Sequence, residues 1–202
     1  MIIGLTGKNA AGKGESAAYL QSKGFFYHSL SDALREIASQ KGLDHSRETL
    51  IALGKQMRLE QGDAFLAIKT NEIIEKQRKI DLGLPIVIDS IRSPIEVKEL
   101  QKNKEFTLVS IDAPIEARFE RIQKRSREGD AKSLEQLKEQ ESLENSKDGK
   151  GQQLDATIAL AKKTIQNDGT IAQLHQKIDK LLKELEPNQT NHDPSADKEP
   201  GK

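Results

Sequence analysis

The sequence predicts an α/β fold in which helices cover both faces of a parallel sheet. Short apolar runs alternate along the chain with longer charged stretches of helical period, an order that produces right-handed crossovers between parallel strands. The run Pro85-Ile86-Val87-Ile88-Asp89 is apolar until its final acid, which is typical of a buried central strand. A glycine-framed loop between the first apolar run and a helix-like stretch is the third observation.

Five short runs are the strand candidates, of which the third and fourth are the most apolar and the fifth is weak. They are Ile2–Thr6, Phe25–His28, Pro85–Asp89, Phe106–Asp112 and Thr164–Gln166. Ligands of parallel sheets bind beyond the carboxyl ends of the strands. We therefore expect residues 7–14, 29–32, 89–92 and 112–114 to lie along one rim.

Eight stretches have helical character. In the second, Leu34, Ile37 and Ala38 share one face and Ser31 is a plausible N-cap. Gly62 separates the third from the fourth, the sixth is basic, and the last is amphipathic. The stretches are Glu15–Lys23, Ser31–Gln40, Ser46–Gln61, Ala64–Lys79, Ile95–Gln101, Pro114–Arg125, Ser133–Glu144 and Thr170–Leu185. Residues 147–153 are expected to form a polar loop.

The length and the composition of the C-terminus predict one domain followed by a tail. The chain has 202 residues, enough for one substantial core and short for two. Its last residues contain three prolines and almost no apolar side chains, a composition that cannot support a packed core. The expected division is residues 1–186 as the folded domain and 187–202 as a disordered polar tail.

The charge balance and the cysteine content restrict the possible partners. Lysine plus arginine equals aspartate plus glutamate, 32 of each, so a general polyanion-binding surface is not indicated, and we expect neither nucleic-acid nor membrane partners. The absence of cysteine excludes disulfides and thiolate chemistry and suits a reducing cytoplasm. No apolar run approaches the ~20 residues of a membrane helix. The histidines are scattered without ligand spacing, at positions 28, 45, 175 and 192. The sequence leaves open whether the chain is a monomer or a homodimer.

The glycine-framed loop has the G-x-x-x-x-G-K spacing of a phosphate-binding loop, or Walker A motif. It reads Gly7-Lys8-Asn9-Ala10-Ala11-Gly12-Lys13-Gly14. Gly7 and Gly12 allow backbone N–H groups to turn inward onto one concavity, and the following helix adds its own N–H groups and positive dipole end. Lys13 supplies a mobile cation for the outer phosphates. This loop, with Glu15 beside it, is the expected nucleotide-binding segment.

One position departs from the usual motif. Gly14 follows the lysine, where most such loops place the Ser or Thr whose hydroxyl meets Mg²⁺. Glu15 and Ser16 come next, so Ser16 or water-mediated contacts would have to substitute. The Lys-Gly pair resembles the loop of adenylate kinases, in which a threonine stands at the position of Glu15.

Acidic and basic residues beyond the strands are the candidates for chemistry. Asp89 could hold Mg²⁺ or act as a base, or it could cap the helix that follows. Arg92 suits bidentate phosphate binding, unless it pairs with Glu96. Asp32 and Arg35 lie one helical turn apart, near the expected acceptor site.

The basic helix carries the second strong signal. Arg118, Arg121 and Arg125 lie at i, i+3 and i+7 and share one face. Arginines delivered by a closing segment stabilise the charge that builds up during phosphoryl transfer. Because acids are interleaved with them, a solvated helix held by salt bridges is the alternative.

These segments occur in an order that resembles the nucleoside-monophosphate-kinase-like group of P-loop proteins. Within that group the phage-type deoxynucleoside monophosphate kinases and the archaeal dephospho-CoA kinase-like proteins are the most similar. The segments are Gly7–Gly14, Ser31–Arg35, Leu53–Arg58, Asp89–Arg92 with Glu96, and Arg118–Arg127.

The resemblance implies a P-loop NTPase three-layer fold with a five-stranded parallel sheet, a bound ATP with Mg²⁺, and an arginine-rich lid near Glu120–Ala131. The acceptor would bind near Ser31–Gly62. By the same likeness Lys13 binds the β and γ phosphates, and Asp89 lies near the metal. Arg35, Arg58 and Arg92 would meet the acceptor, and the lid candidates are Arg121, which would also contact ATP, Arg125 and Arg127.

Three functions remain open from the sequence. The first is a kinase that transfers phosphate from ATP to a small nucleotide-like acceptor such as a nucleoside monophosphate. The second is phosphorylation of a ribose hydroxyl, as in dephospho-CoA kinases, for which Asp32 would serve as the general base. The third is an NTP-binding switch without kinase activity. The donor base, adenine or guanine, also remains open.

Overall fold

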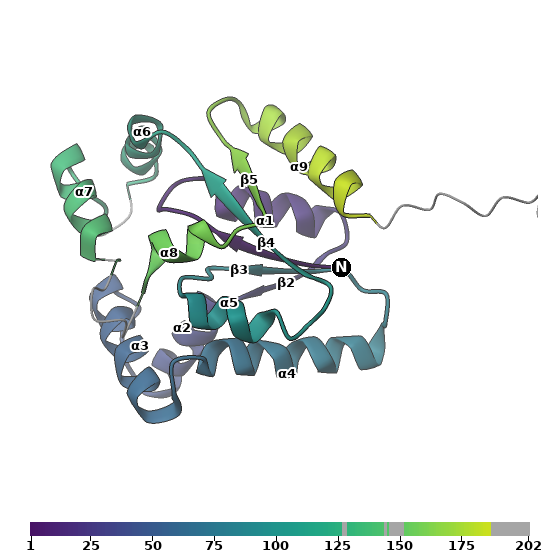
Figure 1. The fold of residues 1–202 in the computed structure, drawn as a ribbon. Helices are drawn as coiled ribbons and strands as arrows, with labels where there is room; N and C mark the ends of the chain where they lie inside the picture. The colour runs from purple at the N-terminus through teal and green to yellow at the C-terminus, as the bar shows by residue number, and fades with distance from the viewer. Residues whose placement is uncertain (127–128, 144, 146–151, 187–202) are drawn as a thin grey trace, which may run out of the picture.

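The computed structural model describes residues 1–126, 129–143, 145 and 152–186, and its centre is a parallel sheet (Figure 1). The strands stand in the order β2-β3-β1-β4-β5, and every neighbouring pair is parallel. Their bounds are Ile2–Thr6 (β1), Phe26–Ser29 (β2), Ile86–Asp89 (β3), Phe106–Asp112 (β4) and Lys163–Gln166 (β5). The five expected strands and their parallel direction are confirmed.

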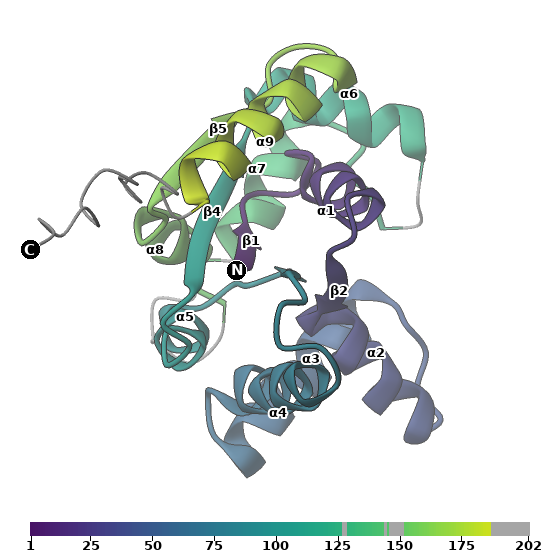
Figure 2. The ribbon, with the colours of Figure 1, turned by 90° about the vertical axis from the view of Figure 1, so that its right-hand side faces the viewer.

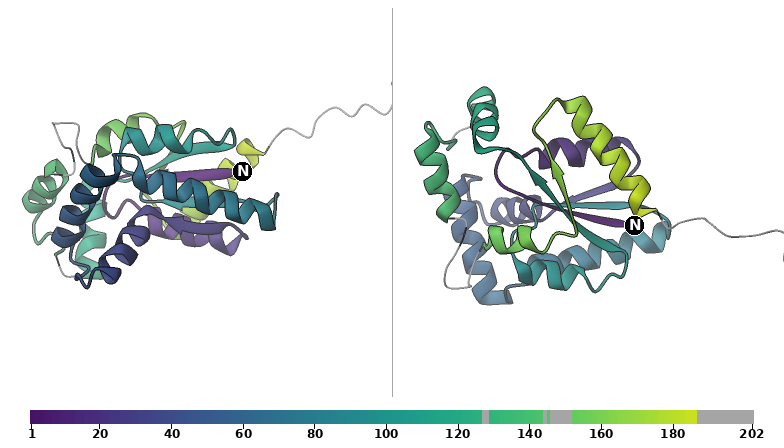
Figure 3. Two further views of the ribbon diagram at one scale, coloured as in Figure 1. Left: turned by 90° about the horizontal axis from the view of Figure 1, so that it is seen from below. Right: turned by 45° about the horizontal axis from the view of Figure 1, so that its top comes forward.

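Helices cover both faces of the sheet, which confirms the three-layer α/β fold (Figures 1 and 2). One face packs against α1 (Lys13–Ser22) and α9 (Ile171–Leu185), and the other against α2 (Leu30–Gln40), α4 (Phe65–Ile80) and α5 (Pro94–Leu100). The remaining helices are α3 (Arg47–Gln61), α6 (Ile115–Arg125), α7 (Leu134–Leu143) and α8 (Leu154–Ala159). Of these, α3, α6 and α7 lie toward the carboxyl ends of the strands (Figures 1 and 3).

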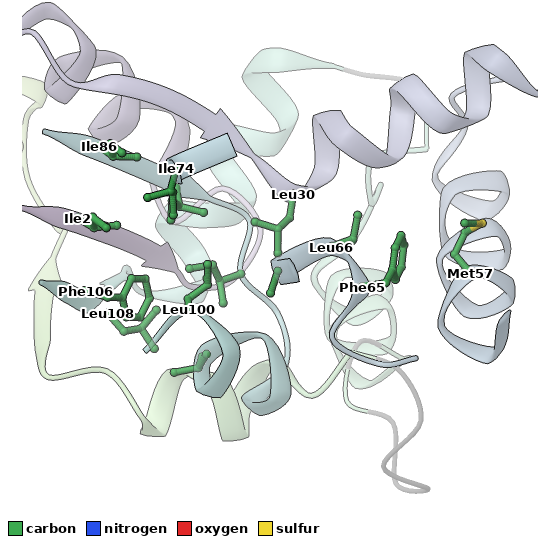
Figure 4. Close-up of a cluster of buried hydrophobic side chains, with 14 of the residues drawn as sticks. Ile2, Leu30, Met57, Phe65, Leu66, Ile74, Ile86, Leu100, Phe106 and Leu108 are labelled. Atoms are coloured by element: carbon green, nitrogen blue, oxygen red, sulfur yellow. The ribbon is translucent and has the colours of Figure 1, made fainter. Parts of the chain in front are cut away.

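The alternation of side chains along each strand explains the two layers. Successive side chains of a strand point to opposite faces, so Ile2 and Ile3 enter different clusters of buried side chains. Figure 4 shows the cluster on the α4 and α5 side, where Phe106, Leu108 and Leu100 lie together. Because both of its faces are buried, β3 is apolar up to Asp89, whereas β1 and β4 include a few small polar residues among their apolar ones.

The structure corrects several expected boundaries and adds one helix. The N-cap of α2 is Ser29, whose hydroxyl oxygen accepts from the Asp32 N–H, and Ser31 lies inside the helix. The sequence did not predict α8, because a helix of 6 residues is too short to display a helical period. At the start of α9, Ile171 remains 60% exposed although its helix is amphipathic.

Two expectations concern residues that the structure does not describe. The disordered tail was predicted for residues 187–202, and most of the polar loop for residues 147–153; both remain predictions. Within the described part of the chain, none of the helices combines the length and apolar character that a membrane span requires.

The interior strand β3 should be sensitive to the loss of side-chain volume. Ile88 is fully buried between the sheet and its covering helices, so Ile88→Ala leaves a cavity and should lower the free energy of unfolding by about 2 to 5 kcal/mol. The matched control is Ile80→Ala at a position that is 81% exposed, where we expect a change within about 0.5 kcal/mol. Urea denaturation of both variants tests this, and equal effects would contradict the placement of β3 in the core.

Candidate active site

The P-loop, residues 7–14, joins the end of β1 to α1 and packs closely against neighbouring backbone. Gly7 has φ +137° and Gly12 has φ +115°, a region that favours glycine. A Cβ at Gly7 would collide with the Ile111 carbonyl oxygen, and one at Gly12 with the Asn167 amide. Glycine is therefore required at both positions, because neighbouring atoms leave no room for a Cβ and because φ is positive. The loop forms a tight cradle.

The concave side of this cradle carries the features that an anion needs. Gly12 caps α1 without a side-chain hydrogen bond, so the first N–H groups of the helix have no intrahelical acceptor and favour negative charge. The Lys13 Nζ donates to the carbonyl oxygens of Gly7 at 2.6 Å and Lys8 at 3.0 Å. The ammonium thus lies across the loop, where an incoming phosphate would meet it.

Two other side chains of this segment, those of Lys8 and Glu15, are directed away from the cradle. The Lys8 ammonium lies 3.6 Å from the Glu141 carboxylate of α7 and 3.4 Å from that of Asp155 in α8. Glu15 forms a 2.8 Å hydrogen bond with His175 of α9. A nucleotide could therefore meet the backbone at these positions, but the structure turns both charged groups toward neighbouring helices.

Ser16 does not fit its predicted role as a Mg²⁺ ligand. Its side chain is fully buried, and its hydroxyl donates to the Gly12 carbonyl at 3.0 Å. A serine inside a helix commonly bonds the carbonyl four residues earlier, and here this bond points the hydroxyl into the first turn of α1. The prediction for Ser16 is corrected accordingly. At Gly14 a Cβ would meet nothing within 4 Å, so sterics do not explain why a hydroxyl residue is missing there.

The arginines of α6 share one face, as their spacing predicts, but this face contacts the P-loop backbone. Arg118 donates to the Asn9 carbonyl and forms a buried ion pair with Glu141. Arg121 donates to the carbonyls of Ala10 and Ala11 at 3.3 and 3.4 Å. Both side chains support the loop from outside, so the expected lid role of Arg121 does not match this arrangement.

Arg125 is the α6 arginine that reaches the cavity. Its guanidinium donates to Asn9 Oδ1 at 3.1 Å and forms an ion pair with Asp130 at 2.6 Å. This side chain lines the cavity next to the P-loop, and its role as a lid arginine stays a prediction. The further lid candidate Arg127 lies outside the described residues.

A cavity of about 350 Å³ opens between the P-loop, α2, α3, the end of β3 and the segment after α6. Its walls combine cations with aliphatic side chains. The cations are Lys13, Arg35, Arg58, Arg92 and Arg125, and the aliphatic side chains are Leu30, Leu34, Leu50, Ile51 and Leu66. Thus the structure brings the predicted nucleotide loop and the three predicted acceptor arginines to one space.

The acceptor arginines have different partners. Arg35 forms a 2.5 Å ion pair with Asp32, and Arg58 forms a 3.4 Å ion pair with Glu96. The Arg92 side chain donates to Gln152 Oε1 at 3.3 Å, whereas its backbone N–H donates to Glu96. The alternative in which the Arg92 guanidinium pairs with Glu96 is therefore replaced by a backbone contact. Asp32 is exposed and does not line the cavity.

Glu96 organises the acceptor side, a role that its sequence position did not reveal. Its carboxylate accepts from the N–H groups of Arg92 and Ser93, at 2.9 and 3.1 Å, and from the Arg58 guanidinium. With Ser93 it forms the capping box of α5. One buried side chain thereby fixes two acceptor arginines. The S-x-x-E pattern was visible in the sequence, and it signals the cap but not the contact with α3.

Asp89 occupies the position expected of it, at the carboxyl end of β3, which pairs with β1. It is buried, and its Oδ1 accepts from the Ser90 N–H at 2.6 Å. Ser93, rather than Asp89, caps α5, so the helix-cap alternative is wrong. Among the described residues, His, Asp and Glu side chains form no group of three that could hold a metal. A magnesium ion here would rely on one carboxylate, phosphate oxygens and water, a ligand set that Mg²⁺ commonly uses.

Comparisons with known proteins agree with this geometry. Residues 3–147 match the family described as AAA domain. A UPF0200 protein of Pyrococcus abyssi (strain GE5 / Orsay) is 32% identical over 192 residues, which cover 92% of this chain and 97% of the relative. A UPF0200 protein of Pyrococcus furiosus is 35% identical over 186 residues, covering 90% and 96%.

Two solved structures are similar in fold. TT1252 from Thermus thermophilus has a TM-score of 0.60 at 22% identity and covers 93% of this chain and 98% of its own. A shikimate kinase from Acinetobacter baumannii in complex with shikimate has a TM-score of 0.54 at 16% identity, with coverage of 92% and 94%. The P-loop kinase-like fold predicted from the sequence is confirmed, whereas the narrower subfamily stays a prediction.

The environment of Glu96 predicts a specific pH dependence. Burial raises the pKa of Glu96, although the Arg92 N–H, Arg58 and the Ser93 N–H act in the opposite direction. A carboxyl group whose folded pKa is raised adds stability that is complete below its unfolded pKa and is lost as the pH rises through the folded pKa. Relative to Glu96→Gln, the wild type should be most stable near about pH 4 and lose that advantage at higher pH.

Urea denaturation of both proteins across this pH range measures the difference in unfolding free energy. Glu48→Gln, at an exposed position in the first turn of α3, controls for the loss of one negative charge. An advantage of the wild type that grows with increasing pH would show that the ionised carboxylate is the favoured buried form, contrary to this account.

Proposed function

The chain belongs to the AAA domain family, and from this premise we propose that it is an ATP-dependent phosphotransferase with a small, phosphate-bearing acceptor. The γ-phosphate of ATP would pass to a nucleotide-like molecule such as a (deoxy)nucleoside monophosphate. The observation that carries the proposal is one cavity lined by Lys13 of the P-loop and by Arg35, Arg58 and Arg92. Phosphate sites for a donor and for an acceptor would thus face each other.

The charges of the cavity suit a reaction between two anions. Phosphoryl transfer depends mainly on positioning and on cations that stabilise charge on the phosphate oxygens. Lys13 would bind the donor phosphates, and Arg125, beside Asn9 at the loop apex, would reach the transferred group. Planar guanidinium groups suit the acceptor because they bind phosphate through two parallel hydrogen bonds.

The carboxylates around the cavity favour a phosphate acceptor over a hydroxyl acceptor. Among the described residues that line the space, the carboxylates are Glu96 and Asp130, and each is paired with an arginine. Asp32, the base considered for a ribose hydroxyl, is exposed and paired with Arg35. A phosphate oxygen is already a nucleophile at neutral pH, whereas a hydroxyl requires a positioned base. The dephospho-CoA kinase-like reaction is therefore the second candidate.

Magnesium would accompany ATP, and Asp89 is the carboxylate that we propose to hold it, directly or through water. When bound, the ion neutralises charge on the β and γ phosphates. The protein itself contributes the amides of the P-loop, the Lys13 ammonium and the enclosed cavity. An NTP-binding switch would not need an acceptor space lined with arginines, which makes that reading the third candidate.

A panel of acceptors tests the proposal. In the presence of Mg²⁺ and ATP, the rate of ADP release should rise sharply with one nucleoside monophosphate and remain near the basal rate with dephospho-CoA. Lys13→Ala should lower acceptor-dependent kcat/KM by orders of magnitude, since the donor phosphates lose their cation. Release that does not depend on any acceptor would favour the switch, and stimulation by dephospho-CoA alone would favour the hydroxyl reaction.

Arg92→Ala separates the acceptor side from the donor side within the same assay. We expect a raised KM for the acceptor, with the Kd for ATP unchanged, because the guanidinium lines the cavity and bonds to Gln152, which is not part of the P-loop. Arg78→Ala, which removes an arginine bonded to Leu82 and Glu105 outside the cavity, is the matched control. If both variants change the kinetics equally, Arg92 has no specific acceptor role.

A further inference from the structure

Asn167, which follows β5 directly, connects three parts of the site. Its side-chain Nδ2 donates to the Ala11 carbonyl at 2.8 Å, and its backbone N–H donates to the Asp112 carbonyl at the end of β4. Its own carbonyl accepts from Arg121 at 2.8 Å. Asn167 is buried, so these bonds form away from water, where a lost partner is costly.

The Ala11 carbonyl is held by two donors. The Arg121 guanidinium lies 3.4 Å from it, in addition to the Asn167 amide, and also contacts the Ala10 carbonyl at 3.3 Å. Neither Asn167 nor Arg121 lines the cavity. Both hold the Ala11 carbonyl, and through it the peptide that joins Ala11 to Gly12.

Because the peptide bond is planar, fixing the direction of the Ala11 carbonyl also fixes the direction of the Gly12 N–H. In a trans peptide the C=O of one residue and the N–H of the next point in opposite directions. Since the Ala11 carbonyl points at Asn167 and Arg121, the Gly12 N–H points away from these two side chains. The Asn167 amide can approach this closely because residue 12 has no Cβ.

We infer that Asn167 and Arg121 are positioning residues that orient the Gly12 N–H toward a bound phosphate. The inference rests on the proposed function, since it presumes that the P-loop binds a phosphate chain. It assigns a role to Asn167, which the sequence motifs did not single out. It also assigns Arg121 to support of the phosphate cradle instead of delivery from a lid.

Asn167→Asp in the full-length chain tests the inference, because it keeps the shape of the side chain and replaces its N–H donor with an oxygen. The probe is inorganic tripolyphosphate, which reports on the phosphate cradle without a nucleobase. Titration calorimetry should give a Kd raised about tenfold or more, the effect of one hydrogen bond to a charged group. In NMR spectra, the change that tripolyphosphate induces in the Gly12 amide resonance should be smaller in the variant.

Ile165→Val is the matched control, since it removes one methylene from a buried residue of β5 that packs in the cluster with α9 and makes no hydrogen bond to the Ala11 carbonyl through its side chain. It should lower the melting temperature while leaving the tripolyphosphate Kd and the Gly12 resonance unchanged. A purely structural role for Asn167 would give this same pattern for Asn167→Asp and would overturn the inference. Arg121→Ala, at a partly exposed position, provides a second variant if Asn167→Asp does not fold, and it should also weaken binding.

The binding measurements distinguish a failure of the proposed function from a failure of the positioning role. If wild-type protein does not bind tripolyphosphate or ATP, the proposed function fails and the inference fails with it. If wild-type protein binds both ligands and the Asn167 and Arg121 variants bind tripolyphosphate equally well, the proposed function stands and only the positioning role is wrong.

Discussion

The site depends on one steric constraint, the close packing of the P-loop backbone against the ends of β4 and β5. Gly7 lies against the Ile111 carbonyl and Gly12 against the Asn167 amide, with no space for a Cβ at either position. This packing holds Gly7 and Gly12 at positive φ, and the non-glycine Ala10 between them also has a positive φ of 59°. The buried parallel sheet supplies the rigid support, so the conformation of the cradle is determined by the core beneath it.

Charged groups then divide into two sets around this loop. Arg118 and Arg121 bind loop carbonyls from outside, and Lys8 pairs with acids of α7 and α8. Lys13 and Arg125 line the cavity together with the acceptor arginines, of which Arg58 is held by Glu96 and Arg92 by Gln152. Outer contacts of this kind fix the inner groups in advance, which is the condition for effective electrostatic stabilisation of phosphoryl transfer.

Local sequence patterns predicted the fold and much of the site. The P-loop motif, the acid that ends β3 and the shared face of the α6 arginines are each encoded within a few residues. The direction in which each side chain points is not encoded locally, because it depends on partners that are distant in sequence. Arg121 bonds to Asn167, and Arg58 bonds to Glu96. Asn167 therefore escaped prediction, and Glu96 was named only as a possible partner of Arg92 and not as a partner of Arg58. Asp32 and Ser16 received roles that their surroundings do not support. The helix α8 was missed because a single turn and a half shows no period.

A crystal structure with Mg²⁺ and a non-hydrolysable ATP analogue tests the central claim most directly. The account predicts the triphosphate in the Gly7–Gly14 cradle, the Gly12 N–H directed at a phosphate oxygen, and the Lys13 ammonium moved from the Gly7 and Lys8 carbonyls onto the phosphates. A nucleotide bound elsewhere, with Lys13 still on those carbonyls, would contradict it.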